Sequence, residues 1–328
     1  MAGLATALAL AKQGFTHIDV YEYASNLGFV GAGIQLAPNM ARILDRLGVW
    51  KEVEKEAVDL KFTSIRGMFP LNRPSLKGPA VPLLHDDCCC RHGTDWLIES
   101  MRLDGASDKE LGHVDLTYVR STYTYPHMVG HRSSLAGALY EGCVRENASI
   151  HFHFSTTLTA IESFGPKPSF TTQTREGETS QVTCDILLAA DGVKSQIRDS
   201  MLAAQNISAK IIDTGQAAYR IMLTREQLSH DPELLALLDA EAVTRWIGAK
   251  RHIIAYPVSN NQVYNISTLQ PDLNFADAPS ATYTTKGSKR QMLDVFGDFC
   301  PRIERMLDLV PEGEVCKSHC PLPSIRSI

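Results

Sequence analysis

Asp191 and Gly192 directly follow four consecutive apolar residues, 186–189, within the stretch Cys184–Arg198. The apolar run is too short for a helix and predicts a strand that is buried on both faces, as in a parallel sheet. Ligands of open α/β sheets bind at the carboxyl ends of such strands, so Asp191 stands where an acid could contact a ligand. Ser195 could then cap a following helix. Taken alone, the same residues could form an ordinary turn between a strand and a helix.

Gly3 and Glu22 have a spacing that matters for nucleotide binding. Gly3 opens an apolar helical stretch that stops at Gly14, and a strand-like stretch at 17–23 carries Glu22. Their separation is close to the ~20 residues between the glycine turn of a dinucleotide-binding fold and the acid that binds ribose hydroxyls. A complete fingerprint would place a strand and G-x-G-x-x before Gly3. The sequence begins at Met1, so we expect the first strand to be missing.

Two further places combine small or cationic residues with the boundary of an element. Ala32 and Gly33 lie in a glycine-rich run. Residues this small let the backbone approach a flat ligand closely, although the same run could be a plain loop. Arg132 follows a strand-like stretch and begins a helix that Ser133 or Ser134 could cap. Its guanidinium could bind a phosphate or a ring oxygen, or could pair with a surface acid.

Composition argues against nucleic-acid, membrane and metal partners. The 328 residues carry a net charge of -5 without a long block of like charge, so nothing indicates nucleic acid or an anionic membrane. No apolar run approaches the ~20 residues that span a bilayer. Eight cysteines without regular spacing favour reduced thiols and a cytoplasmic location. The cluster at 88–92 lacks the C-x2-C spacing of a zinc site, and the cluster at 316–320 offers at most three ligands, so we expect no metal.

The order of the expected elements predicts an α/β protein of two interleaved domains. The first domain would comprise 1–70 and 119–200, with an irregular insert at about 70–118 that contains prolines and has no sustained periodicity. The second domain would span 201–328, with an antiparallel sheet, one face of which could form a pocket wall. The expected strands lie at 150–154, 157–162, 169–174, 217–223, 242–247, 252–258 and 263–269, with a hairpin turn at Glu176-Gly177. A helix is expected after Pro38, and the closing helices at 291–299 and 303–309.

Together these motifs resemble the single-component, FAD-dependent aromatic hydroxylases, the salicylate hydroxylase-like monooxygenases. The resemblance covers most of the chain except about residues 70–120, and it depends on the order and spacing of the motifs rather than on any one of them. The matching pieces are the Gly3 helix with Glu22, the run GAGIQLAPN at 31–39, His131-Arg132, the run DGVKSQIR at 191–198, Tyr219-Arg220 and Tyr256-Pro257.

The resemblance implies a fold, a reaction and a set of partners. The fold would be a Rossmann-like FAD-binding domain interleaved with an antiparallel-sheet substrate domain. In the reaction, NAD(P)H would reduce FAD, and molecular oxygen would then hydroxylate a small aromatic ring, phenolic or carboxylated. We expect no nucleic acid and no membrane span.

The resemblance also implies roles for named residues. Glu22 would bind the adenosine ribose of FAD. Arg220 and Tyr256 would face the substrate, since a guanidinium can hold a phenolate or carboxylate and a tyrosine hydroxyl can fix a ring. Alternatively, Arg220 could form a surface ion pair and Tyr256 could be a half-buried strand residue. The other cofactor-binding residues would be Gly3, Ala32, Gly33, Arg132, Asp191 and Gly192.

Two features depart from the family pattern. We expect the first strand to be missing, and in the sequence the run 321–324 (PLPS) is not followed by the Gly-Asp motif that holds the ribityl-phosphate region of the flavin in the family. We therefore expect a chain truncated at both ends that binds FAD poorly. One alternative is a non-catalytic remnant of the fold that does not hold flavin. A plain NAD-dependent dehydrogenase is disfavoured, because no catalytic His or Tyr-Lys constellation can be picked out.

Overall fold

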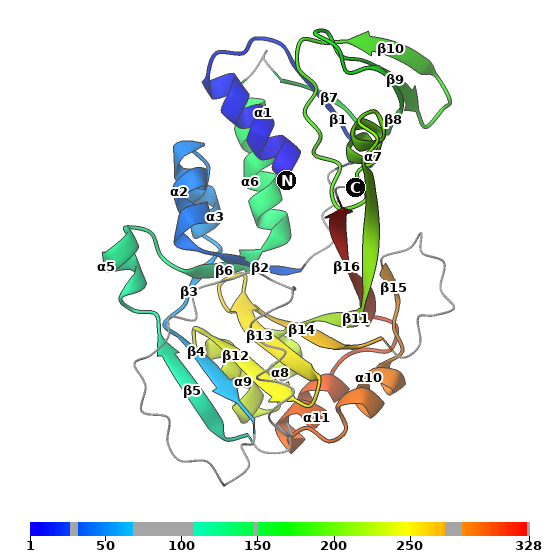
Figure 1. Ribbon diagram of the computed structural model, residues 1–328. Coiled ribbons are helices and arrows are strands. Elements are labelled where there is room, and N and C mark those ends of the chain that lie inside the picture. The colour runs from blue at the N-terminus through cyan, green and yellow to red at the C-terminus, as the bar shows by residue number, and fades with distance from the viewer. Residues whose placement is uncertain (27–31, 68–107, 147–149, 273–283, 327–328) are drawn as a thin grey trace. The chain divides into compact units, whose positions relative to one another are not determined.

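The chain divides into two compact units (Figure 1). The computed structural model describes residues 1–26, 32–67, 108–146, 150–272 and 284–326. Unit 1 comprises Met1–Ala57, Gly130–Ile212 and Pro323–Ile328, and unit 2 comprises Val58–Val129 and Asp213–Leu322. The division differs from the predicted domain boundaries, because residues 58–67 and 119–129 belong to unit 2. Most of the predicted insert at 70–118 lies outside the described residues.

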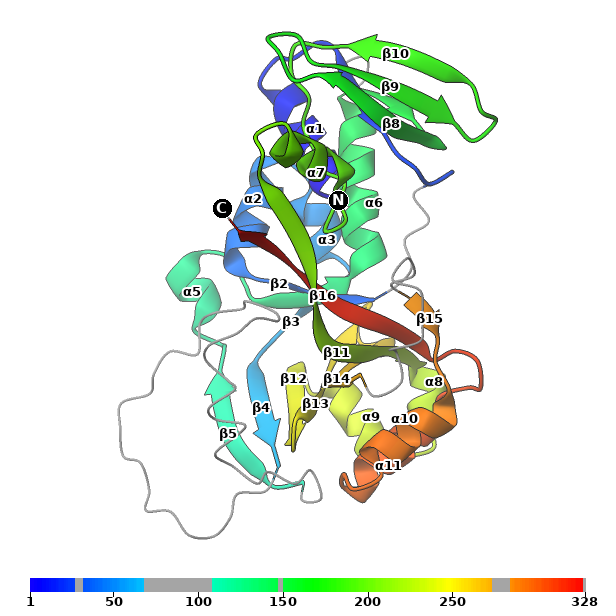
Figure 2. The same cartoon turned by 45° about the vertical axis from the view of Figure 1, so that its right-hand side comes forward.

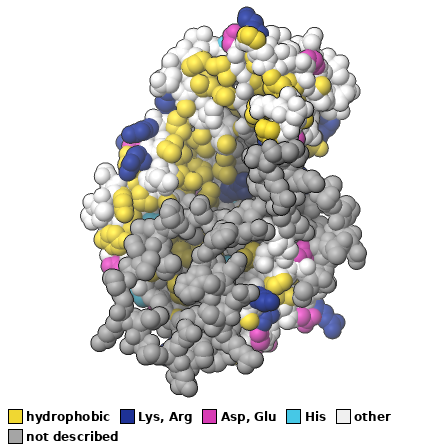
Figure 3. Space-filling view, viewed as in Figure 1, with side chains coloured by type: hydrophobic (Ala, Val, Ile, Leu, Met, Phe, Trp, Pro, Cys, Tyr) yellow, Lys and Arg dark blue, Asp and Glu magenta, His cyan; other side chains and the backbone are white. Residues whose placement is uncertain are grey.

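Unit 1 begins with a helix followed by a strand. Helix α1 (Ala2–Lys12) ends before Gly14, whose φ of 89° lies in the left-handed region that glycine adopts without steric cost. Strand β1 (Ile18–Tyr21) pairs in parallel with β7 (Ile150–His153). Nearly every residue of α1 is apolar, and Figure 3 shows apolar side chains gathered on the face of unit 1 that carries α1.

Helix α6 (Arg132–Arg145) packs closely against α1 through a glycine. A Cβ atom added at Gly142 would lie 2.7 Å from Cγ1 of Val49 and 2.9 Å from Cδ2 of Leu8. Real Cβ atoms do not tolerate such distances, so only glycine permits this approach of α6 to its neighbours. This packing fixes the position of α6, and Arg132 is the first residue of that helix.

The cap of α6 differs from the prediction. The N-cap residue is His131, whose Nδ1 accepts a hydrogen bond from the backbone N–H of Ser133 at 3.3 Å. Ser133 already lies in the first helical turn, and the hydroxyl of Ser134 donates to Glu56 instead. The prediction that Ser133 or Ser134 caps the helix was therefore wrong, because the helix begins earlier than the serines suggest.

Three antiparallel strands follow β7, and the first two of them were predicted. They are β8 (Thr156–Ser163), β9 (Ser169–Thr174) and β10 (Thr179–Thr183), in the spatial order β10-β9-β8. The turn between β9 and β10 contains Gly177, which has a φ of 94°. The left-handed conformation at this glycine gives the tight reversal that the sequence predicted.

The predicted buried strand at 186–189 is not formed. This segment contains no helix or strand, and the side chains of Ile186 and Leu188 are 59% and 53% exposed. A strand inside a parallel sheet needs hydrogen-bonded neighbours. Within the described part of the chain, the backbone of residues 187–190 makes no such bond. The apolar run therefore forms no strand with any of the described residues.

Unit 2 is built on the sheet with strand order β15-β16-β11-β14-β13-β12-β4-β5. The neighbours β11, β14, β13 and β12 are antiparallel, as predicted, whereas β12 pairs in parallel with β4. Strand β5 pairs with β4 and occupies part of the predicted irregular insert, which is a correction at 110–115. The bounds are β4 (Phe62–Arg66), β5 (Glu110–Asp115), β11 (Ser208–Thr224), β12 (Ala242–Gly248), β13 (Arg251–Val258), β14 (Val263–Pro271), β15 (Thr284–Lys286) and β16 (Cys316–Arg326).

Helices cover one face of this sheet (Figure 2). Alternate strand residues such as Trp246, Ile253 and Tyr264 point into the core between sheet and helices, and each is at most 1% exposed. Their neighbours along each strand therefore point to the opposite face, because side chains alternate in a strand. The covering helices are α8 (Arg225–Leu228), α9 (Pro232–Asp239), α10 (Lys289–Phe296) and α11 (Pro301–Asp308).

The remaining elements are short. Strands β2 and β6 are neighbours in a small sheet, and β3 pairs with β6 through Val58 and Val129. The helix expected after Pro38 is formed. The bounds are α2 (Pro38–Arg46), α3 (Trp50–Glu54), α5 (Val119–Tyr123), β2 (Gly33–Leu36), β3 (Val58–Asp59) and β6 (Met128–His131).

Candidate functional site

Glu22 is the first residue after β1, and its backbone is held on both sides. Its N–H donates to the carbonyl of His153 at 3.0 Å, and its carbonyl accepts from the N–H of Thr156 at 3.0 Å. Oε1 of the side chain accepts from the N–H of Ala24 at 2.9 Å. Oε2 makes no hydrogen bond within the described residues. Oε1 is thus fixed at the end of β1, and Oε2 can accept a hydrogen bond from a hydroxyl group.

The fold brings Arg132 next to Ala32. The N–H of Arg132 donates to the carbonyl of Ala32 at 2.9 Å, immediately before β2 begins at Gly33. The side chain of Arg132 is exposed and forms no ion pair with any described residue. Burial lowers the pKa of the Met1 amino group, the positive charge of Arg132 lowers it further, and Glu22 raises it. Arg132 and Glu22 therefore both lie near the start of α1.

Asp191 and Gly192 form the turn that leads into α7 (Gln196–Ala203). Oδ2 of Asp191 accepts from the N–H of Ile197 at 3.3 Å, and Gly192 has a φ of 81°. A Cβ atom added at Gly3 would lie 3.4 Å from Cβ of Ala190. The start of α1 and the segment before Asp191 thus meet through residues with little or no side chain.

These groups in unit 1 have the chemistry that a dinucleotide such as FAD requires. Glu22 offers an acceptor for a ribose hydroxyl, and Arg132 offers a guanidinium for a phosphate. Gly3, Ala32 and Gly33 leave room for a close backbone approach. The first N–H groups of α1 have no side-chain cap, and the N-terminus of a helix attracts phosphate. The residues fit the cofactor, and their individual roles stay predictions.

Arg220 and Tyr256 lie on the sheet face of unit 2 that α8–α11 leave uncovered. Arg220 is opposite Ser267, and Tyr256 is opposite Asn265, two residues away on the same strand. Directly opposed residues and residues two apart point to the same face. The two Cα atoms are therefore separated by two strand spacings and two residues, or about 12 Å. Arg220 is exposed, whereas Tyr256 is 6% exposed and packs in one cluster with Val258.

Three further polar side chains on this face were missed in the sequence. Arg245 is opposite Ile254, which is opposite Ser267, so Arg245 and Arg220 lie in one row across four strands. His252 flanks Ile254 on the same face, and Asn265 is the third residue. Burial lowers the pKa of His252 to about 4, with a further contribution from Arg245. Counting alternate residues back from Tyr256 along its strand would have found His252.

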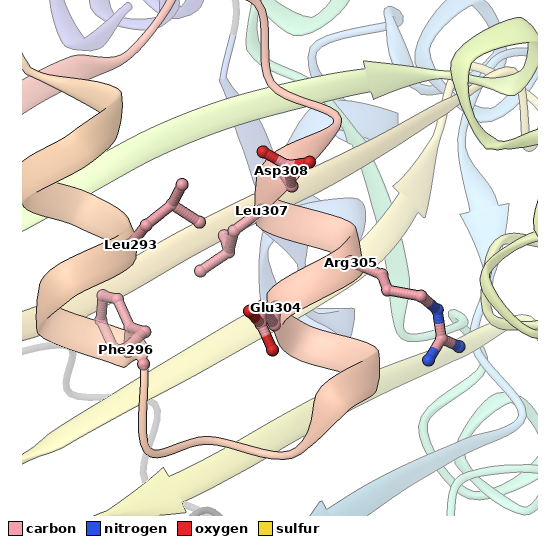
Figure 4. A pocket seen from close by; sticks show the side chains of 7 residues that line it. Leu293, Phe296, Glu304, Arg305, Leu307 and Asp308 are labelled. Atoms are coloured by element: carbon pink, nitrogen blue, oxygen red, sulfur yellow. The ribbon is translucent and has the colours of Figure 1, made fainter.

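A separate pocket of about 510 Å³ lies between α10 and α11 (Figure 4). Leu293, Phe296 and Leu307 contribute apolar side chains, and Arg305 points away from them. The Arg305 guanidinium instead contacts Asp231 at 2.7 Å. Because these helices cover the opposite face of the sheet from Arg220, this pocket is not part of the candidate substrate face.

Neither a metal centre nor a membrane span is found in the parts of the chain that the structure describes. No three His, Cys, Asp or Glu side chains in these ranges are placed to hold an ion. The cysteines at 88–90 lie outside them. Of the described helices, none combines the length and the apolar character needed to cross a bilayer.

Comparisons with known proteins identify the relatives of this chain. It is 27% identical over 308 residues to 3-hydroxybenzoate 6-hydroxylase of Polaromonas naphthalenivorans (strain CJ2), a match that covers 94% of the chain and 62% of the relative. It is also 27% identical over 316 residues to the FAD-dependent monooxygenase OpS4 of Beauveria bassiana, covering 96% of the chain and 62% of the relative. The chain thus spans less than two thirds of the length of these relatives. The predicted resemblance to FAD-dependent aromatic hydroxylases is confirmed.

A solved structure and a family model complete the comparison. The crystal structure of CtdE in complex with FAD and substrate 4 matches with a TM-score of 0.72 at 14% identity, covering 98% of this chain and 68% of that one. This likeness confirms the predicted α/β fold class with its Rossmann-like domain. The model of the FAD binding domain family matches residues 1–262, and the chain therefore belongs to that family.

Proposed function

We propose that this protein is an FAD-dependent monooxygenase that uses NAD(P)H and molecular oxygen to hydroxylate a small aromatic ring bearing a phenolic or carboxylate group. The observation that carries the proposal is the polar row on the sheet face opposite α8–α11, where Arg220 and Arg245 flank Ser267 and Ile254. Two guanidinium groups at the ends of a row with small polar and apolar residues between them suit an anionic ring. The names of the relatives, which include 3-hydroxybenzoate 6-hydroxylase, support the same substrate class.

We assign FAD binding to unit 1. Glu22 would accept a hydrogen bond from the adenosine ribose, and Arg132 would bind the nucleotide beside Ala32 and Gly33. Asp191 and Gly192 would lie near the pyrophosphate. The bound flavin supplies the redox chemistry, and the protein residues supply binding and orientation.

We assign substrate binding to unit 2. The Arg220 guanidinium would hold a carboxylate or phenolate, and Tyr256 would fix the ring edge through its hydroxyl. His252 is neutral at pH 7, because burial and Arg245 lower its pKa to about 4. A neutral imidazole nitrogen can accept a hydrogen bond from a phenolic hydroxyl and so orient the ring.

We place the protein in the cytoplasm. The cysteines at the described positions 143, 184, 300 and 316 are all free thiols. Free thiols are the usual state in a reducing compartment, which supports this location.

The test is the yield of hydroxylated product for each NAD(P)H consumed, with 3-hydroxybenzoate and salicylate as trial substrates and added FAD. We expect Arg220→Ala to lower this yield while NAD(P)H still reduces the flavin, because the ring is no longer oriented. Arg290→Ala is the matched control, since Arg290 is an exposed arginine on the helix-covered side. An unchanged yield in Arg220→Ala would remove Arg220 from the substrate site.

A further inference from the structure

Strand β10 is an open edge of the three-stranded sheet in unit 1. It pairs with β9 on one side, and both views show it as the outermost strand (Figures 1 and 2). The side chains of Thr179, Ser180, Gln181 and Thr183 are exposed. A free strand edge presents a row of N–H and C=O groups, which is a template for another strand.

The hydrogen bonds to β9 show which residues of β10 face outward. The N–H of Thr174 donates to the carbonyl of Glu178 at 2.9 Å, and the N–H of Cys184 donates to the carbonyl of Pro168 at 3.0 Å. In an antiparallel pair the hydrogen-bonded positions alternate, so residues 178, 180, 182 and 184 face β9. Residues 179, 181 and 183 therefore direct their N–H and C=O groups away from the sheet. None of these three makes a hydrogen bond within the described residues.

This edge has few of the features that protect strand edges from pairing. Proteins commonly place a lysine, a proline or a bulge at such an edge. The outward positions hold Thr179, Gln181 and Thr183, which are uncharged, and the pairing with β9 has no register shift. Short length is the one protective feature, since β10 has 5 residues.

The sequence of β10 is complementary to itself in one antiparallel register. When Gln181 faces Gln181 of a second copy, Thr179 faces Thr183, and all outward groups face one another. Threonine pairs and amide pairs across strands are favourable. Glu178 then faces Cys184, and Asp185 faces Gly177, so this register places no acid opposite an acid. The pairing would form about six backbone hydrogen bonds, two for each hydrogen-bonded pair.

We propose that β10 is a self-association site, at which two copies of this chain pair their β10 strands antiparallel about a two-fold axis at Gln181. The two three-stranded sheets then form one continuous six-stranded sheet. An interface of two five-residue strands is small, so the dimer forms and dissociates with concentration.

Cross-linking tests the register. Cα atoms of a hydrogen-bonded antiparallel pair are ~5.5 Å apart, which lies within the ~4.4–6.8 Å that a disulfide spans. Gln181→Cys should therefore give a disulfide-linked dimer under mild oxidation, with the two introduced sulfur atoms bonded to each other by mass spectrometry of the peptides. Gln173→Cys, at an exposed position of β9, is the control, and its introduced sulfur atoms should not be bonded to each other.

Sedimentation velocity over a range of protein concentrations tests the association itself. We expect a monomer–dimer equilibrium in the wild type. Gln181→Pro removes an outward N–H without touching the bonds to β9, and should raise the dissociation constant by about tenfold or more. Gln181→Lys, which places like charges opposite each other, should do the same, whereas Gln173→Lys should not. Circular dichroism checks that each variant is folded. A wild type that stays monomeric, or a dimer unaffected by both changes at Gln181, would overturn the proposal.

Discussion

Asp108 and Trp246, which are 138 residues apart in the chain, are joined by a hydrogen bond of 3.0 Å from the indole Nε1 to the carboxylate Oδ1. The same carboxylate accepts from the Arg66 guanidinium at 3.1 Å and forms an ion pair with Arg302. Trp246 is 0% exposed and lies in the core of unit 2. The carboxylate of Asp108 therefore joins side chains from three elements, β4, β12 and α11.

Asp108→Asn should destabilise the protein. The amide keeps an acceptor for Trp246 but removes the charge that the two arginines share, which takes the ion pair from the partly buried Arg66 and leaves Arg302 only its longer contact with Glu233. We expect the free energy of unfolding in urea to fall by about 2 kcal/mol, the usual magnitude for hydrogen bonds to charged groups. Asp294→Asn, at an exposed aspartate of α10, should change it by less than about 0.5 kcal/mol. Equal effects of the two changes would contradict the assigned role of Asp108.

Alanine in place of two different glycines of α6 should change the free energy of unfolding in opposite directions. Gly142→Ala should lower the free energy of unfolding by about 1–3 kcal/mol, because the new Cβ would overlap Val49 and Leu8. A Cβ added at Gly137 meets no atom within 4 Å. Gly137→Ala should therefore stabilise the protein by about 0.5–1 kcal/mol through helix propensity alone. Thermal or urea unfolding of both variants measures the difference, and a stabilising Gly142→Ala would refute the close packing of α6 on its neighbours.

The parts of the fold that depend on local sequence could be predicted. The end of α1 at Gly14 and the reversal at Gly177 follow from residues within a few positions of each other. Ser195 caps α7 as predicted, with its Oγ accepting from the N–H of Arg198 at 2.9 Å. Turn and cap chemistry acts over such short ranges, so the sequence pattern is sufficient there.

The parts that depend on distant partners could not be predicted. Strand β4 pairs in parallel with β12, so Phe62 is opposite Ala242, and no local pattern indicates that pairing. The prediction of a strand at 186–189 was wrong for the same reason. Apolar residues form a strand only where a neighbouring strand completes the hydrogen bonds.

The candidate site was predicted in part. The resemblance to a known family pointed to Arg220 and Tyr256, which lie on one sheet face, but it did not point to His252 or Arg245. These two have no motif of their own. Their connection with Arg220 depends on the register of four strands, which becomes visible only in the folded sheet.

His252 should make stability depend on pH. Burial and Arg245 lower its folded pKa from 6.5 to about 4. Between these values the unfolded chain binds a proton that the folded protein does not, so the free energy of unfolding falls as the pH decreases. From pH 7 to pH 4 we expect His252 to contribute a loss of roughly 2–3 kcal/mol.

Urea unfolding at several pH values, in the wild type and in His252→Gln, isolates this contribution. The glutamine variant should lose stability less steeply between pH 6.5 and 4. His230→Gln, which changes an exposed histidine of the same unit, should keep the wild-type dependence. NMR titration of the His252 ring measures the pKa directly, and an ordinary value near 6.5 would contradict the burial described.

The binding of FAD to the wild type and to Glu22→Ala tests the central claim most directly. Titration of the flavin-free protein, followed by fluorescence, should show saturable binding to the wild type. In Glu22→Ala, the loss of a hydrogen bond to a charged group, ~1.5–3 kcal/mol, should raise the dissociation constant by about ten- to a hundredfold. Glu176→Ala, in the exposed turn before β10, is the matched control and should bind FAD like the wild type. No saturable binding to the wild type, or the same dissociation constant for wild type and Glu22→Ala, would contradict a flavin site at the end of β1.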